Sequence, residues 1–144
     1  MKKQIYINLI VKDLAKASAF YEAIGCTKNP LFSNADASAM VWSDEISFML
    51  LTEPFALNFN DDKDIADQKK TVGALYALSL DSKQAVDVFC ENAKNAGGRV
   101  YTNKFNQEMA SDFMYTFEVE DPDGYILEPA FMDISKFPKP EDTI

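Results

Sequence analysis

The sequence predicts an α+β protein built from two tandem βαβββ modules. Three observations support this fold class. Each half of the chain contains one apolar pattern with a helical period, each helical pattern ends at a glycine, and runs with the period of two that is typical of half-buried strands surround each helix. Internal repetition of this kind indicates a duplicated supersecondary unit. We place the first module at about residues 4–53 and the second at about residues 72–132.

The first module begins with a strand at residues 5–11, where apolar and polar side chains alternate. Its polar face carries Tyr6 and Asn8, and its apolar face is predicted to pack under the helices. Asp13 is the predicted N-cap of the next helix, and Gly25 ends that helix because glycine tolerates a positive φ. The apolar stripe of the helix consists of Ala17, Phe20, Tyr21 and Ile24, and three strands follow at residues 27–32, 37–42 and 46–52.

A polar segment, residues 54–71, is the predicted linker between the modules. It lacks the loop glycine and the closing glutamate of a calcium-binding EF-hand, so we interpret it as a solvated connection. The second module repeats the order of elements, with a capping box that begins at Asp81 and a helix that ends at Gly97. Its helical stripe is Ala85, Val88, Phe89, Ala93 and Ala96, and its strands are predicted at residues 72–80, 99–105, 112–120 and 125–131. The tail, residues 133–144, is predicted to pack loosely.

A tight turn at residues 121–124 joins the last two predicted strands. Its proline presets one φ angle and its glycine supplies the positive φ that closes a short hairpin loop. On the strand before the turn, Glu118 lies on the predicted polar face. On the strand after the turn, Glu128 is the only charged residue. A buried carboxylate needs a partner, a metal ion or a proton, so Glu128 is the candidate catalytic residue.

Composition limits the possible partners. At 144 residues the chain is predicted to form a single domain, spanning residues 1–144. Lys and Arg number 14 against 23 Asp and Glu, and the resulting net charge of -9 argues against a nucleic-acid partner.

Polar residues break the only apolar run near the start, so no membrane segment or export signal is predicted. Cys26 and Cys90 form no Cys-x-x-Cys motif, and two free thiols favour a cytoplasmic location.

Short motifs occur in both modules: residues 11–14, Phe20, Tyr21 and Gly25 in the first, and residues 121–125 followed by Glu128 in the second. These motifs resemble those of the vicinal oxygen chelate superfamily. That superfamily includes glyoxalase I, the bleomycin and fosfomycin resistance proteins and the extradiol dioxygenases, and the sequence looks most like its bacterial branch of predicted lactoylglutathione lyases. The resemblance implies two curved mixed sheets around a cleft, with the helices on the outside.

In the metal-dependent members of that superfamily, four side chains hold one divalent ion. The resemblance places the four positions at Tyr6, Met49, Leu75 and Glu128 of this sequence. Only Glu128 is a suitable ligand, and the chain contains no histidine, the usual first choice for Zn, Ni or Fe. We therefore predict no metal at this position and no cofactor.

The expected cleft is an apolar pocket with few polar groups, which is the usual composition of a small-molecule site. Its candidate ligand-binding residues are Tyr6, Asn8, Met49, Leu75 and Ser79. With 11 Phe, 6 Tyr and 1 Trp in the chain, some aromatic rings can line the cleft and favour a planar or cationic ligand. The alternative is that the polar side chains only satisfy buried neighbours.

Several functions stay open at this point. The chain is predicted to bind a small molecule in its cleft without the family metal. One alternative is a metal-independent lyase or isomerase with Glu128 as the general base, and a second is a divalent-metal lyase resembling lactoylglutathione lyase. A third possibility is a scaffold for dimerisation. A free Glu128 favours catalysis and an ion-paired one favours a structural role. A homodimer is expected from the resemblance and from sheet edges that would otherwise be exposed.

Overall fold

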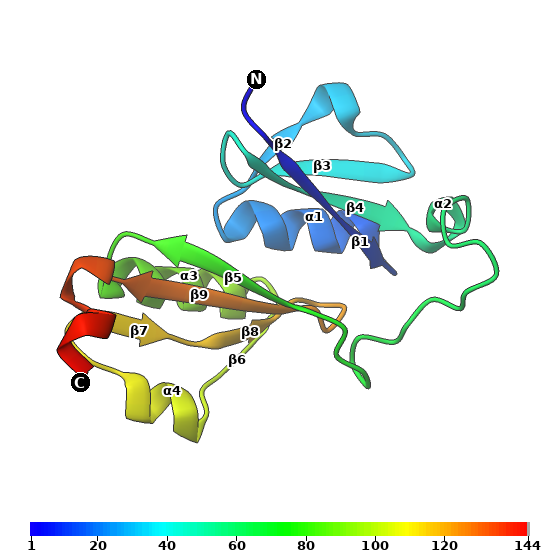
Figure 1. Cartoon of the computed structure of the whole chain (residues 1–144). Helices are drawn as coiled ribbons and strands as arrows, with labels where there is room; N and C mark the ends of the chain where they lie inside the picture. The colour runs from blue at the N-terminus through cyan, green and yellow to red at the C-terminus, as the bar shows by residue number, and fades with distance from the viewer. Residues whose placement is uncertain (144) are drawn as a thin grey trace.

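Two mixed β-sheets, each accompanied by one long helix, form the chain and confirm the predicted α+β class (Figure 1). The structure is a computed structural model and describes residues 1–143. The first sheet has the strand order β1-β4-β3-β2. Its strands are β1 (Ile5–Val11), β4 (Ile46–Thr52), β3 (Ala37–Val41) and β2 (Thr27–Asn29).

The second sheet repeats this plan with one modification. Its strand order is β5-β9-β8-β6, and β7 pairs with β9 beside β8. The strands are β5 (Leu75–Leu80), β9 (Ile126–Met132), β8 (Glu118–Glu120), β6 (Arg99–Tyr101) and β7 (Met114–Thr116). The single strand predicted at residues 112–120 is therefore two strands, interrupted at Phe117. In both modules the first strand pairs in parallel with the last.

The helix of the first module follows the prediction closely. Helix α1 (Leu14–Ala23) is capped by Asp13, whose side chain accepts a hydrogen bond from the Lys16 N–H. Gly25 follows its C-cap with a φ of 121°. The predicted stripe is buried as expected, at Ala17, Phe20, Tyr21 and Ile24.

The helix of the second module differs from the prediction by one residue in its cap. Helix α3 (Lys83–Asn95) is capped by Ser82, not Asp81, because the Ser82 hydroxyl oxygen accepts a hydrogen bond from the Ala85 N–H at 3.0 Å. The buried residues of the helix are Val86, Phe89 and Ala93. The predicted stripe was therefore wrong at Val88, which is 54% exposed.

Five short helical segments depart from the predicted strands, linker and tail. Residues Pro30–Phe32 form a 3-10 turn, η1, where a strand was predicted. Helix α2 (Glu53–Ala56) begins the predicted linker, and helix α4 (Lys104–Met109) replaces the end of a predicted strand. Thr52 and Asn103 cap these two helices with side-chain oxygens, a local signal for a helix start. The tail contains two further 3-10 turns, η2 (Ile134–Lys136) and η3 (Pro140–Thr143), and its last residue, 144, lies outside the described residues.

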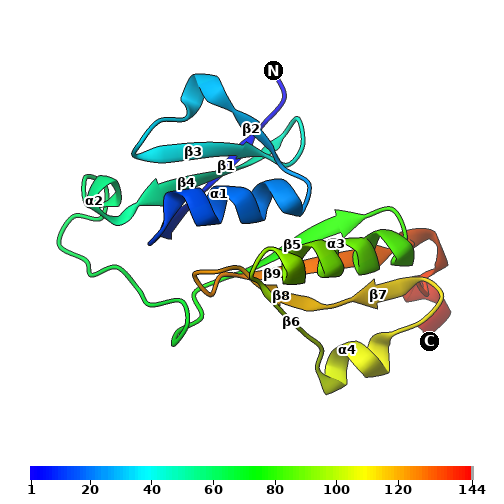
Figure 2. The same ribbon diagram turned by 180° about the vertical axis from the view of Figure 1, so that it is seen from behind.

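The two modules share one apolar core. Helices α1 and α3 lie on the same side of the sheets (Figure 2), and side chains from both modules pack together there. The fully buried members include Phe20, Tyr21 and Phe48 from the first module and Val119 and Leu127 from the second. Such burial is the main favourable contribution to folding, so the modules are expected to fold as one unit. No helix in the described part of the chain has both the length and the apolar character needed to cross a bilayer.

The predicted turn at residues 121–124 joins the two modules through hydrogen bonds. The buried Asp121 carboxylate accepts a hydrogen bond from the Tyr21 hydroxyl of α1 at 2.7 Å and two more from N–H groups of its own turn. The Tyr125 hydroxyl donates to the Ile10 carbonyl and accepts from the Ile10 N–H, both at 2.9 Å. We call Asp121, Tyr125, Tyr21 and Ile10 the inter-module joint. Because β1 and α1 belong to the first module, the joint fixes one module against the other.

Candidate ligand-binding groove

A groove of about 540 Å³ lies on the outer face of the first sheet, the face turned away from α1. This volume is within the usual range for small-molecule sites. Strand alternation positions its lining, because Leu9 and Val11 are buried in the core while Tyr6 and Asn8 point to the opposite face. Its lining includes Gln4, Tyr6, Asn8, Phe32, Asp44 and Met49.

Pairing of neighbouring strands brings three of the predicted site residues together. Asn8 lies opposite Met49 in the parallel pair of β1 and β4, and Tyr6 lies one step along the same face. Ala39 lies opposite Met49 on the other side, so small and flexible apolar side chains form the floor. The far end of the face is closed by α2, whose Ala56 packs with Leu51 in a small apolar cluster.

The rim of the groove combines polar groups with exposed aromatic rings. The Tyr6 hydroxyl donates a hydrogen bond to the Gln4 side-chain oxygen at 2.7 Å, and the Gln4 amide donates to the Asp44 carbonyl at 2.9 Å. Tyr6 is 58% exposed and Phe32 is 63% exposed. The exposed rings offer stacking surfaces, and the exposed carboxylate of Asp44 favours a positively charged guest.

The remaining predicted residues lie on the second sheet and do not line this groove. Ala77 lies opposite Glu128 in the parallel pair of β5 and β9, and the strand period of two places Leu75 and Ser79 on the same outer face. Leu75 is 54% exposed and Glu128 is partly buried. The structure thus groups Tyr6, Asn8 and Met49 on one sheet, and Leu75, Ser79 and Glu128 on the other.

Glu128 has a second carboxyl as its neighbour, which the sequence pattern did not reveal. Burial, the adjacent charge of Glu118 and a hydrogen bond with Glu118 together raise the pKa of Glu128 to about 6. Glu118 is only 7% exposed, although its alternating strand pattern had placed it on a polar face. Asn106 of α4 donates a hydrogen bond to Glu118 at 3.1 Å. We call Glu118 and Glu128 the carboxyl pair.

In the part of the chain that the structure describes, no salt bridge joins the carboxyl pair to a basic residue. Arg99 of β6 lies on the same sheet, but its guanidinium is paired with Glu120 at 2.8 Å and lies over the Tyr101 ring. Glu128 therefore has a carboxyl neighbour but no ion-pair partner within residues 1–143, which is the arrangement that favours a catalytic role over a structural one.

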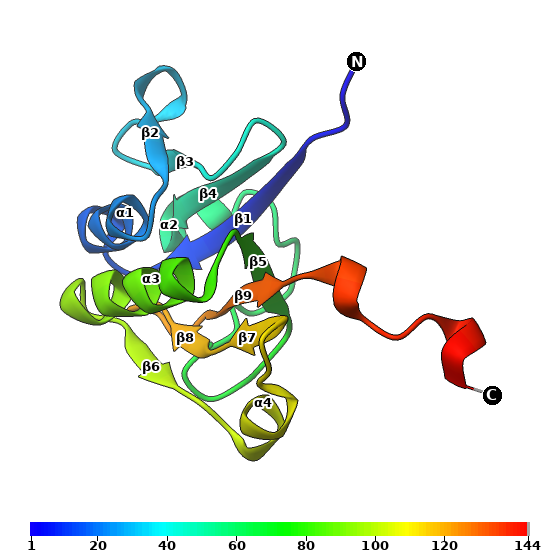
Figure 3. The same ribbon diagram turned by 90° about the vertical axis from the view of Figure 1, so that its left-hand side faces the viewer.

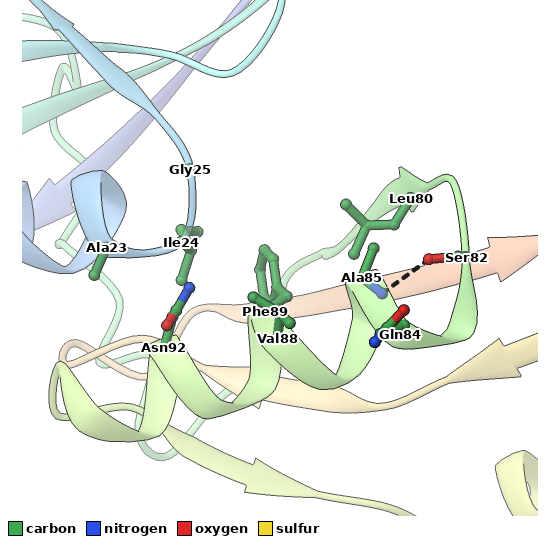
Figure 4. A pocket seen from close by; sticks show the side chains of 10 residues that line it. All are labelled: Ala23, Ile24, Gly25, Leu80, Ser82, Gln84, Ala85, Val88, Phe89 and Asn92. Carbon is green, nitrogen blue, oxygen red and sulfur yellow. Dashed lines mark hydrogen bonds between the residues drawn. The ribbon is translucent and has the colours of Figure 1, made fainter.

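A second hollow, of about 420 Å³, lies on the helical side between the end of α1 and α3 (Figure 4). Its lining contains apolar groups such as Ile24, Val88 and Phe89, and no charged side chain. The Ser82 hydroxyl there already caps α3, as the dashed line in Figure 4 shows. None of the predicted site residues lies in this hollow, so we take the sheet groove as the candidate site.

The side chains present do not fit the divalent ion of the metal-dependent superfamily members. Tyr6, Met49 and Leu75 supply at most one weak oxygen donor and one thioether, which do not suit a hard cation. Within residues 1–143, no three or more Cys, Asp or Glu side chains are grouped so that they could hold a metal ion. A catalytic metal ion usually has about three protein ligands, and the carboxyl pair alone supplies fewer.

The sequence matches no protein-family model and no curated protein. Solved structures do resemble it. A hypothetical protein from S. aureus superposes with a TM-score of 0.71 at 21% identity, over 91% of this chain and 94% of that chain. A glyoxalase/bleomycin resistance protein/dioxygenase family enzyme from Burkholderia phytofirmans PsJN has a TM-score of 0.72 at 15% identity, over 90% and 98%. A bleomycin-binding protein complexed with bleomycin has a TM-score of 0.59 at 18% identity, over 92% and 100%. The chain has the fold of these proteins.

Proposed function

We propose that this chain is a glyoxalase/bleomycin resistance/dioxygenase superfamily protein that binds a small molecule in the groove of its first sheet. The observation that carries the proposal is the gathering of Tyr6, Asn8 and Met49 in one groove of suitable volume. A bleomycin-binding protein with the same fold was solved in complex with bleomycin, which supports small-molecule binding by this architecture.

The ligand class follows from the rim. Tyr6 and Phe32 present exposed rings, and Asp44 adds a carboxylate in a protein with a net charge of -9. A planar ligand that carries a positive charge would stack on the rings and be attracted by the surrounding field. Because Tyr6, Met49 and Leu75 are poor ligands for the family ion, the proposed binding is independent of a divalent metal, and the lactoylglutathione lyase reaction is not part of the proposal.

Binding can be tested with two probes, the planar aromatic cation ethidium and metal-free bleomycin, by fluorescence titration and calorimetry. Phe32→Ala removes a stacking ring, so we expect the Kd of a bound probe to rise about tenfold. Leu31→Ala is the matched control, because Leu31 is in the same turn and 82% exposed but does not line the groove. Equal losses of affinity in both variants, or no binding of either probe at millimolar concentration, would contradict the proposal.

A second candidate function is favoured by the carboxyl pair. With a pKa of about 6, the Glu128 carboxyl loses its proton near neutral pH and becomes a stronger base than an ordinary carboxylate. It could then remove a proton from a carbon acid or a hydroxyl, as a metal-independent lyase or isomerase requires. In this case Glu128→Gln would abolish turnover of a bound ligand while leaving its Kd within about twofold. Binding of the probe with no turnover in the wild type, and an unchanged Kd in Glu128→Gln, would instead support the binding module, because Glu128 does not line the groove.

We also propose a cytoplasmic homodimer. Both cysteines are free thiols, which supports a reducing compartment. Several large apolar side chains on the outer faces, among them Leu75 and Met132, are about half exposed in the single chain and would be covered in a dimer. Light scattering at tens of micromolar is expected to give about twice the 16.2 kDa mass of the chain. A mass equal to that of one chain would contradict the dimer.

A further inference from the structure

Helix α4 has a burial pattern opposite to that of an ordinary surface helix. Among its residues only Asn106, a polar residue, is buried. The large apolar side chains of the helix are turned to solvent, with Phe105 65% exposed and Met109 41% exposed. Surface helices normally attach through an apolar stripe, as α1 and α3 do here. An apolar stripe therefore does not hold α4 against the sheet.

The contact that does hold α4 is polar. The Asn106 side-chain amide donates a hydrogen bond to a buried oxygen of Glu118 at 3.1 Å. Asn103 organises the start of the helix, because its side-chain oxygen accepts a hydrogen bond from the Asn106 N–H at 2.8 Å. Among the ion pairs found within residues 1–143, the one that involves α4 joins Lys104 and Glu108 within the helix itself, and both side chains are mostly exposed. The hydrogen bond between Asn106 and Glu118 is thus the buried polar attachment of α4 to the sheet, and α4 also packs beside β7.

Helix α4 lies against Glu118, one member of the carboxyl pair. Glu118 lies on the outer face of the second sheet, because its neighbour Val119 is buried in the core on the other face. Helix α4 therefore covers the sheet from the side opposite to α3 (Figure 3). Below it, the carboxyl pair consists of Glu118, which is almost fully covered, and Glu128, which is partly exposed.

We propose that α4 is a lid over the carboxyl pair and that the hydrogen bond from Asn106 to Glu118 is its latch. Closed, the lid excludes solvent from Glu118 and holds this carboxylate as a hydrogen-bond acceptor. Open, it exposes Glu118 beside Glu128, so that both carboxyl groups face a solute that approaches the outer face. Phe105 offers little resistance to the opening, since it is 65% exposed and buries little apolar surface in the closed form. This inference concerns the second sheet and does not depend on the proposed function of the groove in the first.

Hydrogen exchange measured by mass spectrometry on the full chain tests the lid. Asn106→Asp preserves the shape of the side chain but replaces the donor with an acceptor, which then faces a carboxylate. We expect the amides of residues 104–109 to exchange about tenfold faster or more, while the amides of β5 and β9 keep their wild-type rates. Glu118→Gln alone keeps an acceptor for Asn106, so the lid should stay closed.

A double variant makes the test specific for the latch. In Asn106→Asp with Glu118→Gln, the glutamine amide can donate to the new carboxylate, so exchange of residues 104–109 should return toward the wild-type rate. Glu108→Gln is the control on the same helix, because it disrupts only the exposed pair with Lys104 and should change exchange less than about twofold.

Unchanged exchange of residues 104–109 in Asn106→Asp would overturn the lid. Faster exchange throughout the second sheet would also overturn it, because Asn106 would then support the whole sheet and not a local latch. If Asn106→Asp does not fold, Asn106→Ala carries the same comparison, since it removes the donor without adding a charge. Trypsin cleavage after Lys104 provides a second readout and should accelerate in Asn106→Asp and Asn106→Ala.

Discussion

The two modules have the same topology but different outer faces. The first sheet has an open groove on this face, with exposed rings at its rim, and α2 closes one end through apolar contacts. The corresponding face of the second sheet carries the carboxyl pair, and α4 covers the part of it around Glu118 through a polar contact. The opposite faces of the two sheets, which carry α1 and α3, are both apolar and meet in one core. A duplicated unit can therefore change its outer face while the shared core keeps the fold.

The inter-module joint holds the two modules together, so that their outer faces can differ. The Asp121 carboxylate receives the Tyr21 hydroxyl from the first module, and the Tyr125 hydroxyl bonds to the backbone of Ile10. None of these side chains lines the groove. Changes at the joint should therefore affect both modules together, whereas changes on an outer face should affect only one.

The largest effect is expected from Asp121→Ala. The substitution leaves the Tyr21 hydroxyl and two turn N–H groups without their acceptor in a buried environment, which should lower the free energy of unfolding by about 3 kcal/mol. For a chain of this size the melting temperature would fall by about 10 °C. Calorimetry should show one transition in the variant, as in the wild type. Two separated transitions would show that the modules fold independently and would contradict the shared core.

Asp121→Asn is the matched variant at the same position. Its side-chain oxygen can still accept from the two turn N–H groups, and its amide can donate to the Tyr21 hydroxyl oxygen, so most of the stability should remain. Burial raises the pKa of Asp121 to about 6, although its hydrogen bonds with Tyr21 and the turn oppose this shift. Because the pKa is higher in the folded protein, the stabilisation is complete below the unfolded value and is lost as the pH rises through about 6. Asp121→Asn should remove this part of the pH dependence.

A smaller effect, limited to the second module, is expected from Glu128→Gln. The pKa of Glu128 is also raised to about 6, so the ionised carboxyl destabilises the folded protein above that pH. The variant should be more stable than the wild type at pH 7.5, by about 1 kcal/mol or less because the side chain is partly exposed and screened. The advantage should disappear near pH 5, where the wild-type carboxyl is protonated. Thermal melts at the two pH values measure the difference.

Glu120→Gln is the control for this measurement. Glu120 lies on the same sheet, but its carboxylate is paired with Arg99 at 2.8 Å. Removing that charge should not stabilise the protein at pH 7.5. A large loss of stability in Glu128→Gln at both pH values would show that Glu128 supports the fold, and Glu128 would no longer be a candidate base.

Local sequence patterns were sufficient for a large part of this fold. Alternation along residues 5–11 placed Tyr6 and Asn8 on the face that became the groove, because the side-chain period of a strand depends only on its backbone. The cap at Asp13 and the turn at residues 121–124 were predicted for the same reason, since hydrogen bonds within a few residues and a positive φ at Gly124 define them. Repetition of these local signals was enough to indicate two modules.

Tertiary contacts decided the rest. The burial of Glu118 depends on α4, and α4 is held by a hydrogen bond between residues of different elements, which no periodicity encodes. The separation of Glu128 from the groove depends on how two sheets are placed, although each strand was predicted near its true position. The sequence by itself determined which side chains share a strand face, because that follows from neighbouring backbone angles. Only the packing of distant segments decided that Glu128 faces Glu118, because the solvent exposure and the proton affinity of a carboxyl group depend on every group around it.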